Sequence, residues 1–249
     1  VAGDSLVFLK PAMPIATNAH VHFGRLYLVD ARDERLIRIS GPNAPEDMTT
    51  DAATLDSNTF KFGELQPKGD TIKSMHSFQR FLGLGGESNL YLYQGTDPIA
   101  DTSARTVSFE IIGLFPQGVV SPDGMLSIGN DLAFISPDGV QTAALVSDAS
   151  TLGRANISEA IKTTIRNLIQ NTSETDIKLI HYPRRSWLMA KLGTSIYCYN
   201  YTAYLGDDAL SQGKTVTPQQ GSWALFDGKF CRQNAYFVRK NSDLICVGA

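Results

Sequence analysis

The sequence predicts a mainly β protein: a β-propeller of antiparallel meander blades with one inserted amphipathic helix. Three observations predict this class. Short apolar runs of strand length recur along most of the 249 residues, polar turn sequences separate them, and one segment carries helical periodicity. Strands do not alternate regularly with helices, as they would in a protein built on a parallel sheet.

The first strand candidates form a hairpin followed by a short meander. Residues 20–29 and 35–39 are apolar runs joined by a polar connection at residues 30–34. Residues 41–58 are rich in Pro, Asn, Asp and Thr and are predicted to form a long loop. Further strands are expected over residues 60–65, 72–76, 80–84, 90–93 and 106–112. Gly83, Gly85 and Gly86 are expected to bend the chain between the strands 80–84 and 90–93.

The tetrapeptide Ser-Pro-Asp-Gly occurs twice, at residues 121–124 and 136–139. Pro fixes φ near the turn value, Asp hydrogen-bonds its own backbone and Gly accepts a positive φ, so each copy predicts a chain reversal. The apolar runs 125–128 and 131–135 lie between the two copies, joined by Gly129-Asn130, which has the composition of a two-residue hairpin loop. The segment is therefore predicted to be a meander, continued by a strand over residues 140–146.

One amphipathic helix is predicted over residues 156–170. Apolar side chains recur there at steps of four and three, and Asn156 followed by Glu159 predicts a capping arrangement. The apolar stripe of this helix needs a buried partner, and a neighbouring subunit is one candidate. Trp187 and Trp223, near strand ends, fit gaps between twisted sheets in a propeller and in a sandwich alike. Six further strands are expected, over residues 176–181, 186–191, 194–201, 222–226, 235–239 and 244–247.

Composition excludes several classes of protein. The chain is 43% apolar and 19% charged with a mean hydropathy of -0.11, and no apolar run approaches the ~18 residues of a membrane span, so no membrane insertion is expected. A net charge of -3 argues against a dedicated nucleic-acid binder. Three cysteines without a CxxC pair predict neither a disulfide framework nor a zinc site, and favour assembly in a reducing cytosol. The two ends of the sequence suggest a segment of a longer subunit.

Each candidate for chemistry has a structural alternative. His20 and His22 share one face of a strand and could ligate a metal, but no second His or Cys cluster lies near them in the sequence, so hydrogen-bonded or solvated histidines are expected. Asp30, Asp33 and Glu34 are residue types used in glycoside cleavage. A polar hairpin loop already accounts for them.

The remaining candidates are also explained by local structure. The glycines of the run from Phe81 to Gly86 lack GxGxxG spacing and a following helix, which favours a β-bulge over a phosphate cradle. Asp123 and Asp138, imaginable as calcium ligands, belong to the two Ser-Pro-Asp-Gly turns. Arg184-Arg185 is interpreted as an exposed loop pair, with phosphate or a partner carboxylate as alternative contacts. No catalytic, cofactor-binding or metal-ligating residue is assigned, no cofactor is expected, and the protein is not expected to be an enzyme.

Several phrases taken in order resemble a known family. They are AHVHFGRLYLVD, SFQRFLGLGGESNLYLYQGTD, GVVSPDGMLSIGNDLAFISPDGVQTA, HYPRRSWLMAKLGTSIYCYNY and SWALFDG. This order is similar to that of the β-propeller tail proteins of short-tailed bacteriophages, the nozzle or hub subunits at the end of the tail tube. The resemblance extends from about His20 to Phe226 and rests on the order of the phrases.

The resemblance implies a structural virion protein. It implies a ring of six identical subunits around a central channel that conducts or gates the genome during ejection. Other tail proteins, an adaptor and a fibre, are its implied neighbours, and genomic DNA would pass without sequence-specific binding. The implied location is the phage tail, after assembly in the host cytoplasm. A glycan-binding or glycoside-cleaving propeller is the alternative from another class, and a propeller scaffold for cellular proteins is a third.

Overall fold

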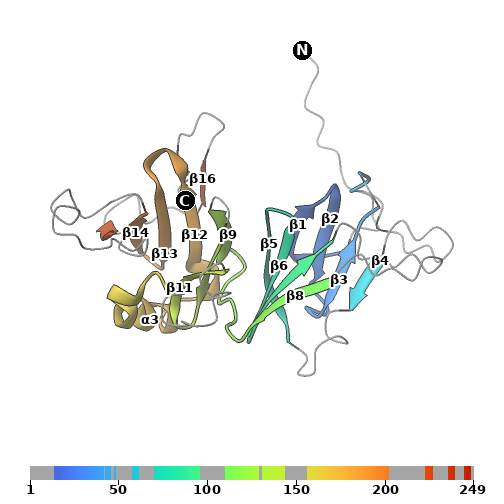
Figure 1. Cartoon of the computed structure of the whole chain (residues 1–249), viewed down its shortest axis with the longest axis horizontal. Helices are drawn as coiled ribbons and strands as arrows, with labels where there is room; N and C mark the ends of the chain where they lie inside the picture. Colours follow the sequence, from blue (N-terminus) through green and yellow to red (C-terminus); the bar gives the residue numbers. More distant parts are fainter. Residues whose placement is uncertain are drawn as a thin grey trace, which may run out of the picture. The chain divides into compact units, whose positions relative to one another are not determined.

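A computed structural model describes residues 14–41, 43–45, 48, 58–61, 70–95, 110–128, 131–143, 156–201, 222–226, 235–238 and 244–247. These residues form antiparallel β-sheets with little helix (Figure 1), which confirms the mainly β prediction. The chain divides into two compact units. The first unit comprises residues 1–87 and 91–114, the second residues 88–90 and 115–249. Each is described by itself.

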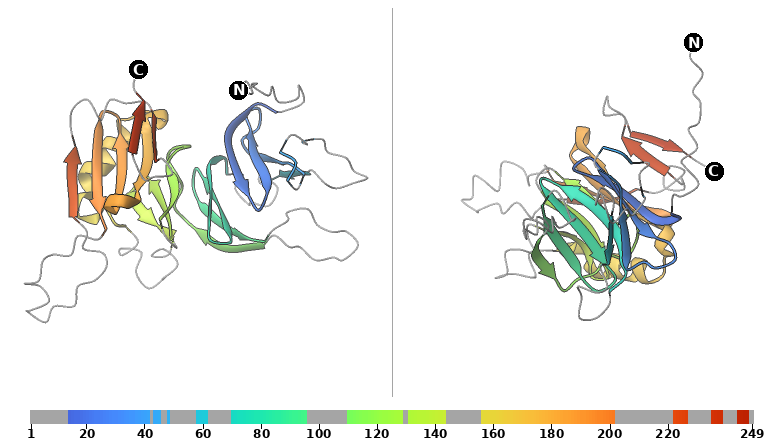
Figure 2. Two further views of the ribbon diagram at one scale, coloured as in Figure 1. Left: turned by 90° about the horizontal axis from the view of Figure 1, so that it is seen from above. Right: turned by 90° about the vertical axis from the view of Figure 1, so that its right-hand side faces the viewer.

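The described residues of the first unit form two four-stranded meanders. One sheet consists of β1 (Ala16–His22), β2 (Arg25–Asp30), β3 (Leu36–Ile39) and β4 (Asn58–Lys61), and the other of β5 (Ile72–Phe78), β6 (Phe81–Gly86), β7 (Leu90–Gln94) and β8 (Glu110–Phe115). In both sheets the order of strands in space follows their order in the chain. Strand β1 contacts β5, so the first strands of the two sheets are neighbours (Figure 2).

The core of the first unit lies between its two sheets. Tyr27 and Val29 of β2 are both at most 1% exposed, as are Ile37 and Ile39 of β3. The other sheet contributes apolar side chains from three strands to the same cluster. Removing these side chains from water supplies the main driving force for stacking the two sheets. The contributing residues are Ile72, Met75, Leu82, Leu84, Tyr91 and Tyr93.

The described residues of the second unit form three sheets. A three-stranded sheet holds β9 (Met125–Ile128), β10 (Asp131–Ser136) and β11 (Gly139–Thr142). A four-stranded sheet holds β12 (Ile177–Tyr182), β13 (Trp187–Leu192), β14 (Ser195–Asn200) and β15 (Ser222–Phe226), and a pair holds β16 (Ala235–Val238) and β17 (Leu244–Val247). Strand β12 contacts both β9 and β16. The strands predicted in these regions are confirmed, apart from residues 144–146 and 239, which lie outside the described residues.

The two Ser-Pro-Asp-Gly turns lie next to each other. The first is closed by a 3.1 Å hydrogen bond from the Gly124 N–H to the Ser121 carbonyl. The second joins β10 to β11, with Ser136 paired in register to Gly139. Ile135, just before the second turn, donates its N–H to the Gly124 carbonyl at 2.8 Å. The repeated turn thus places two reversals at one end of the meander, as predicted; Gly129-Asn130 lies outside the described residues.

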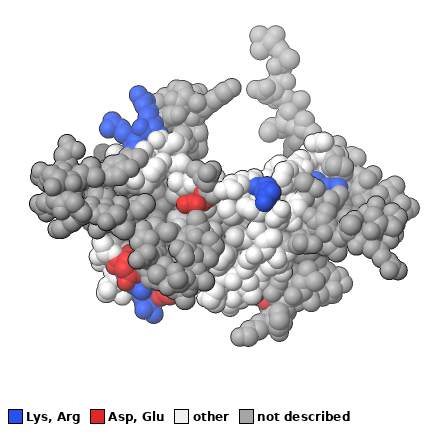
Figure 3. Space-filling model, in the orientation of Figure 1, with Lys and Arg blue, Asp and Glu red and all other residues white. Residues whose placement is uncertain are grey.

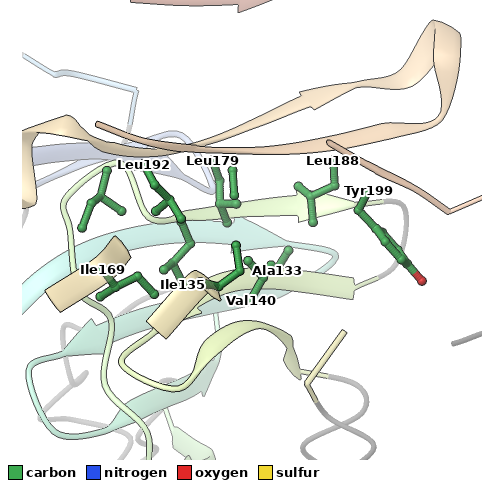
Figure 4. Packing of buried hydrophobic residues seen from close by; sticks show 11 residues of the cluster. Ala133, Ile135, Val140, Ile169, Leu179, Leu188, Leu192 and Tyr199 are labelled. Carbon is green, nitrogen blue, oxygen red and sulfur yellow. The ribbon is translucent and has the colours of Figure 1, made fainter. Parts of the chain in front are cut away.

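The helix buries its apolar stripe within its own unit. A 3₁₀ turn, η2 (Glu159–Ile161), precedes α3 (Lys162–Gln170), so the helix is shorter than the predicted 156–170. Ile165 and Ile169 are buried in a cluster with residues of β10–β14 (Figure 4), and α3 runs along the orange sheet of β12–β15 in Figure 2. The stripe therefore gives no reason to expect a neighbouring subunit on this helix.

The predicted capping arrangement is wrong. Asn156 Oδ1 accepts the N–H of Ser158 at 3.0 Å and its hydroxyl at 2.6 Å. Asn156 Nδ2 donates to the Asp138 carbonyl at 3.0 Å. The backbone N–H of Glu159 donates to the Asn156 carbonyl instead of receiving a side-chain cap. The polar groups of Asn156 are used to hold the β10–β11 hairpin.

Two predictions in the first unit need correction. Residues 20–29 are not one strand, because a tight turn at Phe23 and Gly24, with φ of 44° and 73°, separates β1 from β2. Gly83, Gly85 and Gly86 do not bend the chain between strands but lie inside β6, where all three are buried. This hairpin does contain a bulge, but it lies in β5 and not in the predicted glycine run: the register shifts between Ile72 and Ser74, opposite Gly86 and Gly85. Residues 62–65, 106–109 and most of the predicted loop 41–58 lie outside the described residues.

Candidate functional site: a histidine cluster between two strands

Three of the four histidines meet where β1 contacts β5. His20 and His22 of β1 both reach the Ser77 hydroxyl of β5, at 2.8 Å from His20 Nε2 and 2.7 Å from His22 Nδ1. His76 lies beside His20, with ring centroids 5.0 Å apart. These four residues are called the histidine cluster. Their side chains come from two sheets of the first unit and join them.

The hydrogen bonds determine where the protons lie in the cluster. The backbone N–H of Ser77 donates to His20 Nε2 at 2.8 Å, so this nitrogen carries a lone pair and no proton. The Ser77 hydroxyl lies 2.8 Å from this nitrogen and 2.7 Å from His22 Nδ1, so it bridges the two imidazoles. Because the backbone N–H occupies the lone pair of His20 Nε2, the hydroxyl is free to donate to His22 Nδ1. His22 Nε2 is buried.

Burial keeps these imidazoles neutral. Desolvation lowers the pKa of His22 from 6.5 to about 4, against a smaller opposing effect from the Gly95 backbone. Desolvation likewise lowers the pKa of His76 to about 4, with His20 adding to the effect. The pKa of His20 is also lowered by burial. At neutral pH the cluster therefore acts as a set of neutral donors and acceptors.

The cluster does not have the arrangement of a metal centre or a hydrolase. Among the described residues, no group of three or more His, Cys, Asp or Glu side chains could hold a metal ion. The Ser77 and His20 pair has the spacing of a nucleophile and its base. However, the lone pair of His20 Nε2 already accepts the backbone N–H of Ser77. The predicted hydrogen-bonded role of His20 and His22 is confirmed, whereas His76 and Ser77 were not singled out from the sequence.

Two of the three carboxylates considered for glycoside cleavage, those of Asp30 and Asp33, serve their own hairpin. Asp30 is buried and accepts the Arg38 Nε–H at 2.7 Å and the Arg32 backbone N–H at 2.9 Å. Asp33 Oδ1 accepts the Arg35 N–H at 3.1 Å. These hydrogen bonds fix the β2–β3 turn, in agreement with the structural interpretation.

We expect Asp30→Ala to destabilise the first unit by about 2 kcal/mol, because two donors lose their charged acceptor. Hydrogen bonds from Arg32 and Arg38 lower the pKa of Asp30 from 3.8. Its contribution is therefore fully present above pH 3.8 and is lost as pH falls through the lower folded-state pKa. Urea unfolding, followed by hydrogen exchange of β2 and β3 peptides, measures the loss. Asp33→Ala, at the exposed turn, is the control and should cost less than half as much.

The two turn aspartates also have structural surroundings. Asp123 is exposed and lies 2.7 Å from the Lys178 ammonium, and its carbonyl accepts the Leu179 N–H at 2.9 Å. Asp138 offers its carbonyl to Asn156 and its N–H to Ser136 Oγ. Both residues help to hold neighbouring segments together, as expected for turn positions.

The arginine pair lies on the β12–β13 hairpin. Arg184 and Arg185 are exposed on the turn η4 (Pro183–Arg185), as predicted. The Arg185 guanidinium lies 5.9 Å from the centroid of the Trp187 ring, a cation–π contact. On the face shown in Figure 3, acidic and basic side chains form separate small groups rather than one continuous patch of a single sign. Arg184 and Arg185 therefore lie at the exposed tip of the hairpin, and the Trp187 ring lies next to Arg185.

The described cysteine is a core residue. The Cys198 thiol is buried, which raises its pKa to about 12, so it is a poor nucleophile. The side chains of Cys231 and Cys246 lie outside the described set. In the ranges that the structure describes, no helix has the length and apolar character needed to cross a bilayer.

These observations define a mainly β protein made of antiparallel meander sheets. No protein-family model and no curated protein sequence matches the chain. Among solved structures, PorZ of Porphyromonas gingivalis, described as an essential bacterial surface component of the type-IX secretion system, is 14% identical with a TM-score of 0.38. The match covers 75% of this chain and 20% of PorZ, so the chain spans a fifth of that protein.

A second solved structure is the AfRom2 CNH domain. It is 10% identical with a TM-score of 0.40, and the match covers 93% of this chain and 71% of that one. Both TM-scores are too low to assign a fold family or a function to this chain.

Proposed function

We propose that the chain is a structural virion protein: a β-propeller subunit of the ring that forms a phage tail nozzle or hub. The proposal combines the order of sequence phrases with one structural observation, the way in which the sheets contact one another. In a propeller, each blade is a meander of about four strands whose first strand lies nearest a common axis. First strands of successive blades are therefore neighbours and run in the same sense.

The contacts between sheets follow this pattern in each unit. Strand β1 contacts β5 in the first unit, and β12 contacts β9 and β16 in the second. Near the carboxyl ends of β1 and β5, His20 and His22 meet Ser77. Near the amino ends of β9 and β12, the Leu179 N–H donates to the Asp123 carbonyl. A sandwich, in which two whole sheets face each other, does not require first strands to meet in this way.

A rigid structural role fits the use of the candidate catalytic groups. The Asp30 carboxylate and the Ser77 hydroxyl are each engaged in hydrogen bonds that join strands or close turns. Stacked blades resist deformation, which suits a part that holds its position while DNA passes. Copies that contact one another head to tail close into a ring, here of six subunits, with adaptor and fibre proteins as neighbours.

One exposed strand offers apolar surface for contacts between subunits. Strand β8 is an edge strand, and Ile111, Ile112 and Leu114 on it are 44%, 47% and 56% exposed. Neighbouring exposed apolar side chains on a sheet edge are typical of interaction surfaces. We therefore place one side of the subunit contact on β8.

Native mass spectrometry and negative-stain microscopy of the full chain test this function. We expect a ring of six copies with a central channel. Leu114→Lys should dissociate the ring, whereas Thr194→Lys, which adds the same charge at an exposed turn in the other unit, should leave it intact. A stable monomer that binds a sugar on a glycan array would overturn the proposal and support the glycan-binding alternative.

A further inference from the structure

We propose that the histidine cluster is an acid-sensitive latch: it stabilises the contact between the β1–β4 sheet and the β5–β8 sheet while its imidazoles are neutral, and weakens this contact when the imidazoles become protonated. The latch is a property of the first unit alone. It does not depend on whether the chain forms a ring.

The latch rests first on the direction of its hydrogen bonds. His20 Nε2 accepts the Ser77 backbone N–H at 2.8 Å, and an imidazolium has no acceptor. Protonation of His20 therefore breaks this bond and leaves the Ser77 N–H facing a cation. The Ser77 hydroxyl can still accept from the protonated nitrogen, so that contact is kept. One proton on His20 thus removes the backbone hydrogen bond between β5 and β1.

The second support is the burial of the cluster. His22 is 3% exposed. A second proton on its ring would place a charge in this buried site, and a buried charge without a counterion is costly. His20 and His76 lie with their rings 5.0 Å apart, so charging both places two cations side by side.

The charged groups on the surrounding strands do not relieve this cost. Arg25 is the register partner of His22 on β2, and Tyr27 is the partner of His20. Arg80 lies in the turn that follows β5, whereas Lys73 lies at the far end of β5 beside Ile72. On β6, Gly83 faces His76 in register and carries no charge. Among the described residues of these strands, the charges nearest the cluster are therefore those of Arg25 and Arg80, both cationic.

The described carboxylates of these strands lie elsewhere. Asp30 pairs in register with Ala16, at the opposite end of β1, and binds Arg38. Asp70 and Glu87 lie at the far end of the β5–β6 hairpin, where Ile72 pairs with Gly86. Among the described residues of these strands, no carboxylate lies at the end of the cluster to balance the charge that protonation adds.

The sign of the pH dependence follows from the lowered pKa values. The unfolded histidines bind protons below about pH 6.5, whereas His22 and His76 in the folded chain do so only near pH 4. Between these values the unfolded state binds more protons, so stability falls as pH falls. The contact between the sheets is full above pH 6.5 and weakens progressively toward pH 4.

Two measurements on the full chain test the latch. Histidine ring NMR gives the four pKa values directly, and we expect those of His20, His22 and His76 to lie below 6.5. Hydrogen exchange, corrected for the intrinsic effect of pH, should show that β1 and β5 peptides lose roughly tenfold or more of their protection between about pH 7 and about pH 4.5. Values at or above 6.5 for His20 and His22, or unchanged protection at about pH 4.5, would overturn the proposal.

Variants separate the latch from general acid unfolding. His20→Gln keeps an acceptor for the Ser77 N–H but does not titrate, so the acid-induced loss in β1 and β5 should shrink. His181→Gln makes the same change in the second unit, where His181 bonds Tyr201, and should leave that loss unaltered. If His20→Gln fails to fold, Ser77→Ala replaces it. This variant removes the hydroxyl that bridges His20 and His22 but keeps the backbone N–H on His20, so the acid-induced loss in β1 and β5 should persist. Equal acid-induced losses in wild type and His20→Gln, or no acid-induced loss in Ser77→Ala, would exclude the latch.

Discussion

We expect Leu188→Ala to lower the free energy of unfolding of the second unit by about 3 kcal/mol. Leu188, on the central strand β13, is 0% exposed and packs with Ala133, Leu179 and Tyr199 (Figure 4). Truncation removes three buried carbon atoms. It also leaves a cavity between sheets that α3 helps to close, and the surrounding strands can fill such a cavity only in part.

Urea unfolding followed by tryptophan fluorescence measures this loss. The two tryptophans of the chain, Trp187 and Trp223, both belong to the second unit, so the signal reports on that unit. Leu225→Ala is the matched control, because Leu225 lies on β15 of the same sheet and is 59% exposed. It should change stability by less than about 0.5 kcal/mol. Equal effects of the two substitutions would contradict the packing described for this core.

Local sequence signals were sufficient for most elements of the fold. The strands β10, β13 and β14 appear as short apolar runs bounded by turn residues, and each turn restricts the chain at its own position. The turn at Phe23-Gly24 escaped prediction because an aromatic residue rarely adopts a φ of 44°, and the apolar run continues on both sides of it. The glycines of β6 were expected to bend the chain because closely spaced glycines often mark a bend. Their burial inside a strand depends on strands far away in the sequence, which no local pattern shows.

The histidine cluster shows why the candidate site was only half predicted. His20 and His22 are two residues apart, which places them on one face of a strand, and this can be predicted from the sequence alone. Ser77 lies 57 residues from His20, and their meeting depends on β1 lying against β5. No local pattern encodes that contact. Likewise, Asn156 and Glu159 match a helix cap in sequence, yet Asn156 binds the Asp138 carbonyl because the β10–β11 hairpin lies next to it.

Gly139→Ala should destabilise the second unit by about 3 kcal/mol, through backbone strain together with overlap of side chains. Gly139 ends the second Ser-Pro-Asp-Gly turn with a φ of 131°, which residues with a Cβ rarely adopt. An added Cβ would overlap the Ser158 hydroxyl and lie 3.2 Å from Asn156 Oδ1. Ser158 has little room to move, since its oxygen accepts the Val140 N–H at 3.0 Å and its hydroxyl donates to Asn156 at 2.6 Å.

Gly193→Ala separates the two causes. Gly193 also has a positive φ, 62°, but an added Cβ there would meet only Thr172 side-chain atoms at 3.5 and 3.6 Å. Backbone strain alone should cost about 1 kcal/mol at this position. In the double variant Gly139→Ala with Ser158→Gly, the overlap is absent. Its loss of stability should therefore be smaller than the sum of the losses in the two single variants. Tryptophan-monitored urea unfolding of all four variants gives the comparison. Equal losses of stability in Gly139→Ala and Gly193→Ala, or strict additivity in the double variant, would mean that the Asn156–Ser158 segment does not pack closely against the hairpin.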